Sequence, residues 1–81
     1  METGEVTHFF DRIQVCVIKI TRGGIQKGDR LLIEGKAGQL EQKVTSMQIE
    51  SQDVNSARRG QLIGLKVNKP VKVGDRVYIL H

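Results

Sequence analysis

Two copies of Gly-Asp-Arg are the most regular arrangement of chemically active residues in this sequence. One lies in IQKGDRLLI at 25–33 and the other in VKVGDRVYI at 71–79. Asp29 and Asp75 would form a carboxylate pair for acid–base chemistry or metal binding if the fold brought them together. Neither copy has a His or Cys beside it to complete such a site. We therefore expect a structural role, in which glycine takes the turn conformation, aspartate bonds to the turn backbone, and a strand follows.

The other groups that could react are isolated in the sequence. Cys16 lies in the apolar run IQVCVIKI without a second cysteine, so we expect an inert, buried thiol. His8 and His81 have neither metal-ligand spacing nor an associated nucleophile. In GGIQKGD, Asp29 stands where a phosphate-binding loop needs lysine. The sequence therefore predicts no catalytic residue, metal, cofactor or nucleotide site, and favours a protein that is not an enzyme.

The charge balance of the chain points to a possible class of partner. Thirteen Lys and Arg against nine Asp and Glu give a formal net charge of +4. This favours encounters with polyanions such as RNA, although a solvated basic surface would explain the same excess. In HFFD at 8–11, one phenylalanine would face the core while the other could stack on a base. Our candidate nucleic-acid contacts are the basic and aromatic residues Arg58, Arg59, Lys66, Lys43 and Phe9.

Short β-prone segments separated by turn residues organise the whole chain. They recur at intervals of about 8–12 residues, as is typical of a small β-sandwich or barrel. The six expected strands span 5–10, 13–20, 30–35, 41–50, 62–67 and 76–80, with a tight turn at 36–38. Closing these strands into a barrel would remove the exposed edges of an open sheet. We therefore predict an all-β fold, a small closed or nearly closed six-stranded β-barrel, in one monomeric domain over 1–81.

Four segments in order carry a family resemblance: IKITRGGIQKGDRLLIEG (18–35), KVTSMQIE (43–50), ARRGQLIGLKV (57–67) and VKVGDRVYI (71–79). Together they resemble domain II, the β-barrel domain, of translational GTPases such as elongation factor Tu. The matching positions are Arg22, Gly23, Ile25, Gly28, Asp29, Val44, Ser46, Met47, Ala57, Gly60, Ile63, Gly64, Val71, Gly74, Asp75 and Val77. GEVTHFFDRIQVCVIKI with TSMQIE further resembles stand-alone translation-elongation-factor-like proteins. Similar barrels are also accessory domains at the C-terminus of collagenase-like peptidases.

This resemblance implies a translation-factor domain without GTP hydrolysis, because the sequence lacks a GTPase domain. The first hypothesis is a non-catalytic binding module that contacts tRNA, rRNA or a translation-associated protein. The alternative is a protein-interaction or accessory domain, such as the C-terminal barrel of a collagenase-like peptidase. No apolar run reaches the ~20 residues of a membrane span, and the first residues lack a signal-peptide pattern. We therefore expect a cytoplasmic protein with no membrane partner.

Overall fold

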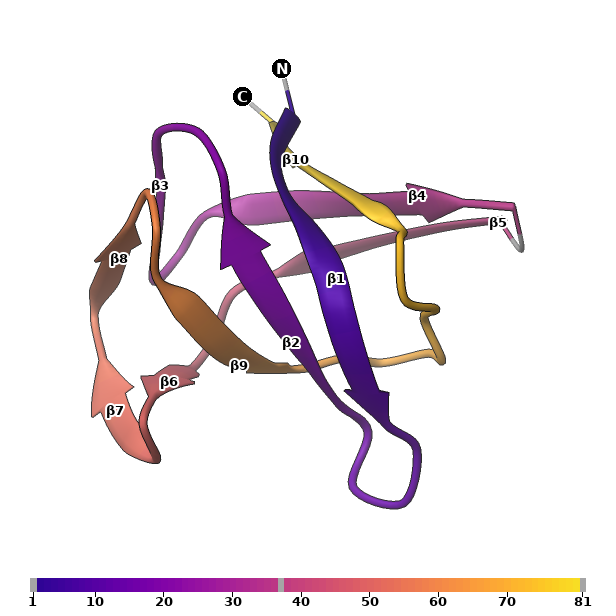
Figure 1. Ribbon diagram of the computed structural model, residues 1–81, viewed down its shortest axis with the longest axis horizontal. Coiled ribbons are helices and arrows are strands. Elements are labelled where there is room, and N and C mark those ends of the chain that lie inside the picture. Colours follow the sequence, from indigo (N-terminus) through magenta and orange to yellow (C-terminus); the bar gives the residue numbers. More distant parts are fainter. Residues whose placement is uncertain (1, 37, 81) are drawn as a thin grey trace.

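The computed structural model describes residues 2–36 and 38–80, which fold into antiparallel β-strands. The strands are β1 (Glu2–Phe10), β2 (Val15–Ile20), β3 (Gly24–Gln26), β4 (Arg30–Gly35), β5 (Gly38–Lys43), β6 (Met47–Ile49), β7 (Gln52–Val54), β8 (Ser56–Arg58), β9 (Leu62–Lys66) and β10 (Arg76–Leu80). Eight of them form one sheet in the order β5-β4-β10-β1-β2-β9-β6-β7, while β3 and β8 form a second sheet. Figure 1 shows the long sheet coiled, so that β1 and β2 cross in front of β4 and β5.

The predicted all-β fold is confirmed, but the described residues form ten strands in place of the six predicted for a closed or nearly closed barrel, and no closed barrel is found among them. The expected strand 41–50 is divided between β5 and β6, because residues 44–46 leave the sheet. Within the part of the chain that the structure describes, no ladder joins β5 to β7, the two ends of the long sheet. The predicted turn at 36–38 includes Ala37, which lies outside the described residues, as does His81.

A single buried side chain connects β5 to the chain that leaves β9. The Nε2 amide of Gln42 donates to the carbonyl oxygen of Lys66 at 2.8 Å, and its Oε1 accepts from the backbone N–H of Asn68 at 2.9 Å. These two bonds satisfy backbone groups that a neighbouring strand would otherwise satisfy. Gln42 therefore holds two parts of the coiled sheet together where no ladder does.

The core follows from the two-residue period of the strands. In β2, Cys16, Ile18 and Ile20 are fully buried, while Val15 and Val17 are half-buried on the opposite face. The run 13–20 is apolar at nearly every position, as in strands covered on both faces, but its outer face stays partly open. The remaining buried apolar side chains come from nearly every strand and are Val6, Ile25, Leu31, Ile33, Leu40, Val44, Met47, Ala57, Ile63, Leu65, Val67, Val71 and Val77.

Both Gly-Asp-Arg copies build the same turn. The N–H of Asp29 donates to the carbonyl of Gln26 at 2.9 Å, and the Asp29 Oδ2 accepts from the N–H of Gln26 at 2.8 Å. Asp75 makes the same two bonds with Lys72, at 3.0 and 2.9 Å. The glycines before the aspartates have φ of 98° and 95°, as the third residue of a type II turn requires. The structural interpretation of the repeated motif is therefore confirmed.

The two aspartates are also too far apart to act as a pair. They precede β4 and β10, which run antiparallel with Arg30 opposite Leu80 and Glu34 opposite Arg76. Asp29 and Asp75 thus lie at opposite ends of this ladder, about 20 Å apart at ~3.3 Å per residue. This separation excludes a shared proton or metal ion between their carboxylates.

A third turn of this kind, in RRGQ at 58–61, was missed in the sequence. The N–H of Gln61 donates to the carbonyl of Arg58 at 3.1 Å, and the Gln61 Oε1 accepts from the N–H of Arg58 at 2.8 Å. Gly60 supplies the positive φ of 92°. Glutamine here replaces aspartate, so a search for Gly-Asp alone does not find it.

We expect Asp29→Ala to lower the free energy of unfolding by about 1 kcal/mol, the net contribution of one hydrogen bond at an exposed turn. Asp29→Asn should lose less, because its amide oxygen can still accept from Gln26. Urea denaturation followed by circular dichroism measures both changes. Equal stability of the alanine variant and the unsubstituted chain would contradict a bracing role for Asp29.

Candidate functional site

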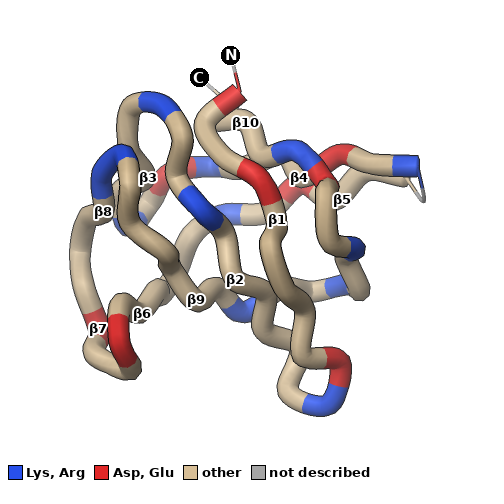
Figure 2. Tube along the Cα trace, in the orientation of Figure 1, with Lys and Arg blue, Asp and Glu red and all other residues tan. Residues whose placement is uncertain are grey.

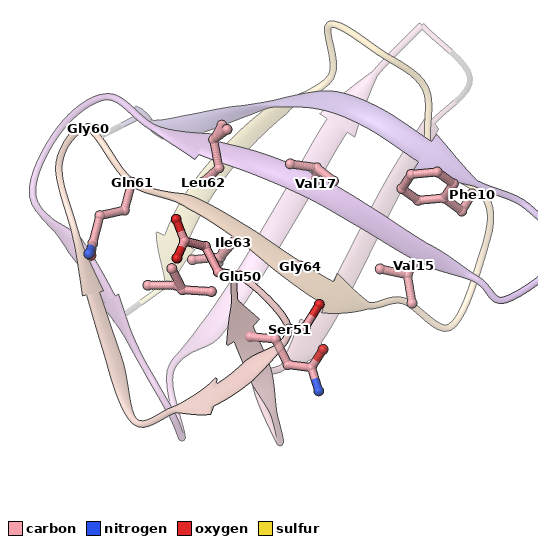
Figure 3. Close-up of a pocket in the computed structure, with 12 residues that line it drawn as sticks. Phe10, Val15, Val17, Glu50, Ser51, Gly60, Gln61, Leu62, Ile63 and Gly64 are labelled. Carbon is pink, nitrogen blue, oxygen red and sulfur yellow. The ribbon is translucent and has the colours of Figure 1, made fainter.

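A groove of about 620 Å³ lies beside the outer face of β2 and β9. Its lining is mainly apolar and comes from β1, β2, β6, β9 and the β6–β7 and β8–β9 turns: Phe10, Val15, Val17, Gln48, Ile49, Glu50, Ser51, Gly60, Gln61, Leu62, Ile63 and Gly64. Figure 3 shows Leu62, Val17 and Phe10 along one side, Glu50 and Ser51 on the other, and Gly64 between them. Phe10 and Leu62 are 45% and 52% exposed, which is unusual for large apolar side chains.

The groove opens because β6 accompanies β9 for only part of its length. β6 pairs with β9 at two positions, Met47 with Leu65 and Gln48 with Gly64. It then turns into β7, so the ladder does not extend along Leu62 and Ile63. At Gly64 the floor is flat, because glycine has no side chain to fill the space.

One carboxylate lies in the lining of the groove, and Lys19 and Lys66 are exposed on the same face of β2 and β9. Among the described lining residues, Glu50 is the only one with an ionisable side chain. Figure 3 shows its carboxylate over the end of the groove near Gln61 and Ile63. Just outside the lining, Asp53 accepts a 3.0 Å hydrogen bond from Gln48 and adds a second negative charge to the hairpin. The groove can therefore receive an apolar group beside a cation.

The turn that carries Glu50 has a strained backbone. Glu50 and Ser51 connect β6 to β7 with φ of 51° and 66°, a combination for which two-residue hairpins prefer Asn-Gly. Non-glycine residues in this conformation are uncommon, and such strain is concentrated at functional sites. The sequence does not reveal this feature, since no residue in IESQ marks a positive φ.

The predicted basic contacts do not form one surface. Arg58 and Arg59 are exposed before β9, where the Arg59 N–H donates to the Gly23 carbonyl. Lys66 and Lys43 are exposed at the far end of β9, where Gln42 reaches the Lys66 carbonyl. Figure 2 shows basic segments distributed along the trace with acidic segments between them. RNA contact through these residues stays a prediction.

The two phenylalanines have different environments, as their alternation in a strand requires. Phe9 is half-buried and packs against the core, so little of its ring is available for stacking on a base. Phe10 lines the groove, with its ring centroid 4.4 Å from that of His8. Phe10 is thus the more accessible ring, although Phe9 was the predicted contact.

Groups with catalytic potential do not converge in the described residues. Over residues 2–36 and 38–80, no three His, Cys, Asp or Glu side chains come close enough to hold a metal ion. Cys16 is fully buried in β2, and the loss of hydration raises the pKa of its thiol from 9.0 to about 12. Such a thiol is protonated at neutral pH and is a poor nucleophile.

We expect Cys16 to react with iodoacetamide only after unfolding, as mass spectrometry of native and denatured samples would show. Rapid alkylation of the native chain would contradict the buried position of the thiol.

The raised pKa of Cys16 also makes the stability of the fold depend on pH. Burial of the neutral thiol contributes fully below its unfolded pKa of 9.0, and that contribution is lost as the pH rises toward about 12. Cys16→Ala should therefore lose less stability between neutral pH and pH ~10 than the unsubstituted chain.

The described part of the chain has no helix long and apolar enough to cross a membrane.

The chain is similar to proteins named as proteases. It is 41% identical over 81 residues to the uncharacterized protease MJ0090 of Methanocaldococcus jannaschii, and 33% identical over 76 residues to a collagenase of Porphyromonas gingivalis. These matches cover 99% and 93% of this chain but only 20% and 21% of those proteins, so the chain spans about a fifth of the length of its curated relatives. No protein-family model matches the chain.

Solved structures show the same fold in a peptidase domain. The C-terminal domain of a putative U32 peptidase from Geobacillus thermoleovorans superposes with a TM-score of 0.91, covering 99% of this chain and 92% of that domain. Its selenomethionine variant gives a TM-score of 0.88 over 95% and 96%. At 17% and 18% identity, these matches establish the fold alone.

These comparisons overturn the identification as a stand-alone translation-elongation-factor-like protein. The similar proteins are a protease and collagenases, and the matched fold is that of a peptidase C-terminal domain. The misleading signal was the order of the glycine turns. Asp29, Asp75 and Gln61 each close a turn through a hydrogen bond to the backbone. Such turns are features of a fold, and a fold does not specify a function.

Proposed function

We propose that this chain is a non-catalytic accessory domain that works with the catalytic part of a U32-type, collagenase-like peptidase. The observation that carries the proposal is its 41% identity, over 99% of its length, to one fifth of a protein named as a protease. The fold shared with the C-terminal domain of a putative U32 peptidase supports it. The remaining four fifths of the relative would then supply the catalytic groups.

A chimera tests this role. The segment of protease MJ0090 that matches this chain is replaced by the 81 residues, and a second version lacks the segment altogether. We expect the chimera to hydrolyse a fluorescent gelatin at close to the rate of the parent, and the truncated protein to lose at least ~10-fold in kcat/KM, as expected when positioning contacts are removed. The isolated chain should hydrolyse nothing.

The matched control carries an unrelated β-domain of similar size in place of the segment. Restoration by this control as well would mean that the domain merely protects the peptidase from unfolding. Full activity of the truncated protein, or hydrolysis by the isolated chain that survives repurification, would contradict the accessory role.

A further inference from the structure

We propose that the groove between β9 and the β6–β7 hairpin binds an extended segment of a polypeptide substrate, with an apolar side chain over Gly64 and a basic side chain at Glu50. The proposal rests on the accessory role only for the source of the segment. The groove itself is a property of the isolated chain.

The edge of β9 beside the groove fits an extended peptide. A hollow of about 620 Å³ accepts a few side chains. The β6–β9 ladder ends at Gly64, so β6 forms no ladder pair with Leu62 or Ile63 in the described structure. A peptide strand can bond to such an edge through its own backbone.

Side-chain selectivity follows from what lines the two walls. Val17, Leu62 and Phe10 offer apolar surface, and Gly64 leaves room above the strand. The one ionisable lining group in the described residues, Glu50, is acidic although the chain carries a net charge of +4. Alternate residues of an extended peptide point to the same side, so an apolar residue and a basic residue two positions away can both enter the groove.

Gly64 offers a substitution that fills the groove without forcing the fold. A Cβ at this position would lie 3.8 Å from Val15 Cγ1 and 4.0 Å from the Gln48 carbonyl oxygen, which are ordinary contacts. Its φ is not in the left-handed region, so a β-branched residue suits the strand. The side chain introduced by Gly64→Val should therefore fill the space that the peptide would occupy.

The binding test uses the ¹⁵N-labelled chain and two synthetic peptides. Both are flexible Gly/Ser peptides, one with a central Leu-Ser-Lys-Ser-Leu and the other with Leu-Ser-Glu-Ser-Leu. We expect the lysine peptide to shift the amide signals of Glu50, Leu62 and Gly64, with a Kd of order 0.1–1 mM, and the glutamate peptide to bind at least ~5-fold more weakly. Glu50→Gln should remove this preference, and Gly64→Val should abolish binding of both.

Leu62→Ser, which changes an exposed side chain, provides a second variant that should weaken binding even if Gly64→Val disturbs the strand. The proposal is overturned if neither peptide shifts the groove signals at millimolar concentration, or if both bind equally. It is also overturned if Gly64→Val and Leu62→Ser bind like the unsubstituted chain. A dimer in sedimentation velocity that Gly64→Val dissociates would assign the groove to a second copy instead.

The chimera identifies the source of the segment. Gly64→Val should raise KM for gelatin several-fold and leave kcat/KM for a short fluorogenic peptide unchanged, because the short peptide does not reach the groove. Equal losses on both substrates, in Gly64→Val and in Leu62→Ser at unchanged Tm, would place the catalytic part in the groove and overturn the proposal. If the chimera fails while the isolated chain still binds the lysine peptide selectively, then the accessory role fails and the peptide groove stands.

Discussion

Replacement of Ile18 by alanine is expected to lower the free energy of unfolding by about 4 kcal/mol. Ile18 is fully buried at the centre of β2, opposite Val6 of β1 and Ile63 of β9. The substitution removes apolar surface from the core and leaves a cavity between three strands, and both effects favour the unfolded state. For a chain of 81 residues, whose total stability is about 4–12 kcal/mol, this is a large fraction.

Thermal unfolding followed by circular dichroism measures this loss as a fall in Tm of about 15–30 °C, at ~4–8 °C per kcal/mol for a domain of this size. Ile13→Ala is the matched control, because Ile13 is 60% exposed between β1 and β2. It should change stability by less than about 0.5 kcal/mol. Similar losses for the two variants would contradict the assignment of Ile18 to the core and Ile13 to the surface.

Gly4→Ala is expected to destabilise the chain by about 3 kcal/mol, because the backbone of β2 occupies the space of the added Cβ. Gly4 pairs with both Ile20 of β2 and Val77 of β10, next to an irregularity in the β1–β10 register. A Cβ there would overlap the carbonyl oxygen of Lys19 and lie 3.0 Å from Ile18 Cγ2. A backbone carbonyl in the middle of the sheet cannot move aside as a flexible side chain can.

Gly64→Ala makes the same chemical change at a position where the added methyl group meets only ordinary contacts. It should leave the Tm within a few degrees of the unsubstituted chain or raise it slightly, since alanine restricts the unfolded backbone more than glycine does. Urea titration of the two variants side by side tests the contrast. Equal stability of Gly4→Ala and Gly64→Ala would show that β1 can move away from Lys19 without cost.

β2 shows what the sequence can predict about a strand and what it cannot. The apolar run around Cys16 predicted a strand correctly, because β-branched residues and a two-residue period require no knowledge of the neighbours. Whether Val15 and Val17 are covered depends on what crosses their outer face. β6 leaves β9 after Gly64, so these side chains line a groove and are not part of a second core.

The division of 41–50 into two strands shows another limit. The segment alternates regularly, yet Val44 lies outside the strands and exchanges backbone hydrogen bonds with Gly28 and Asp29. These partners are 15–16 residues away along the chain, so local pattern could not reveal them. The sequence also could not show whether the charged contact candidates lie close together, because the distance between Arg58 and Lys66 depends on the length of β9 between them.

The sequence by itself determined the β class, the buried cysteine and the turns at Asp29 and Asp75, because these depend on the conformations of neighbouring residues and on hydrophobic alternation. Only the tertiary structure decided how many strands form, which side chains stay exposed, and that Glu50 lies beside Leu62 and Gly64. These features arise from pairing between distant strands, whose register no short segment encodes. The groove therefore depends on how distant strands pair, whereas the glycine turns depend only on residues that are neighbours in the sequence.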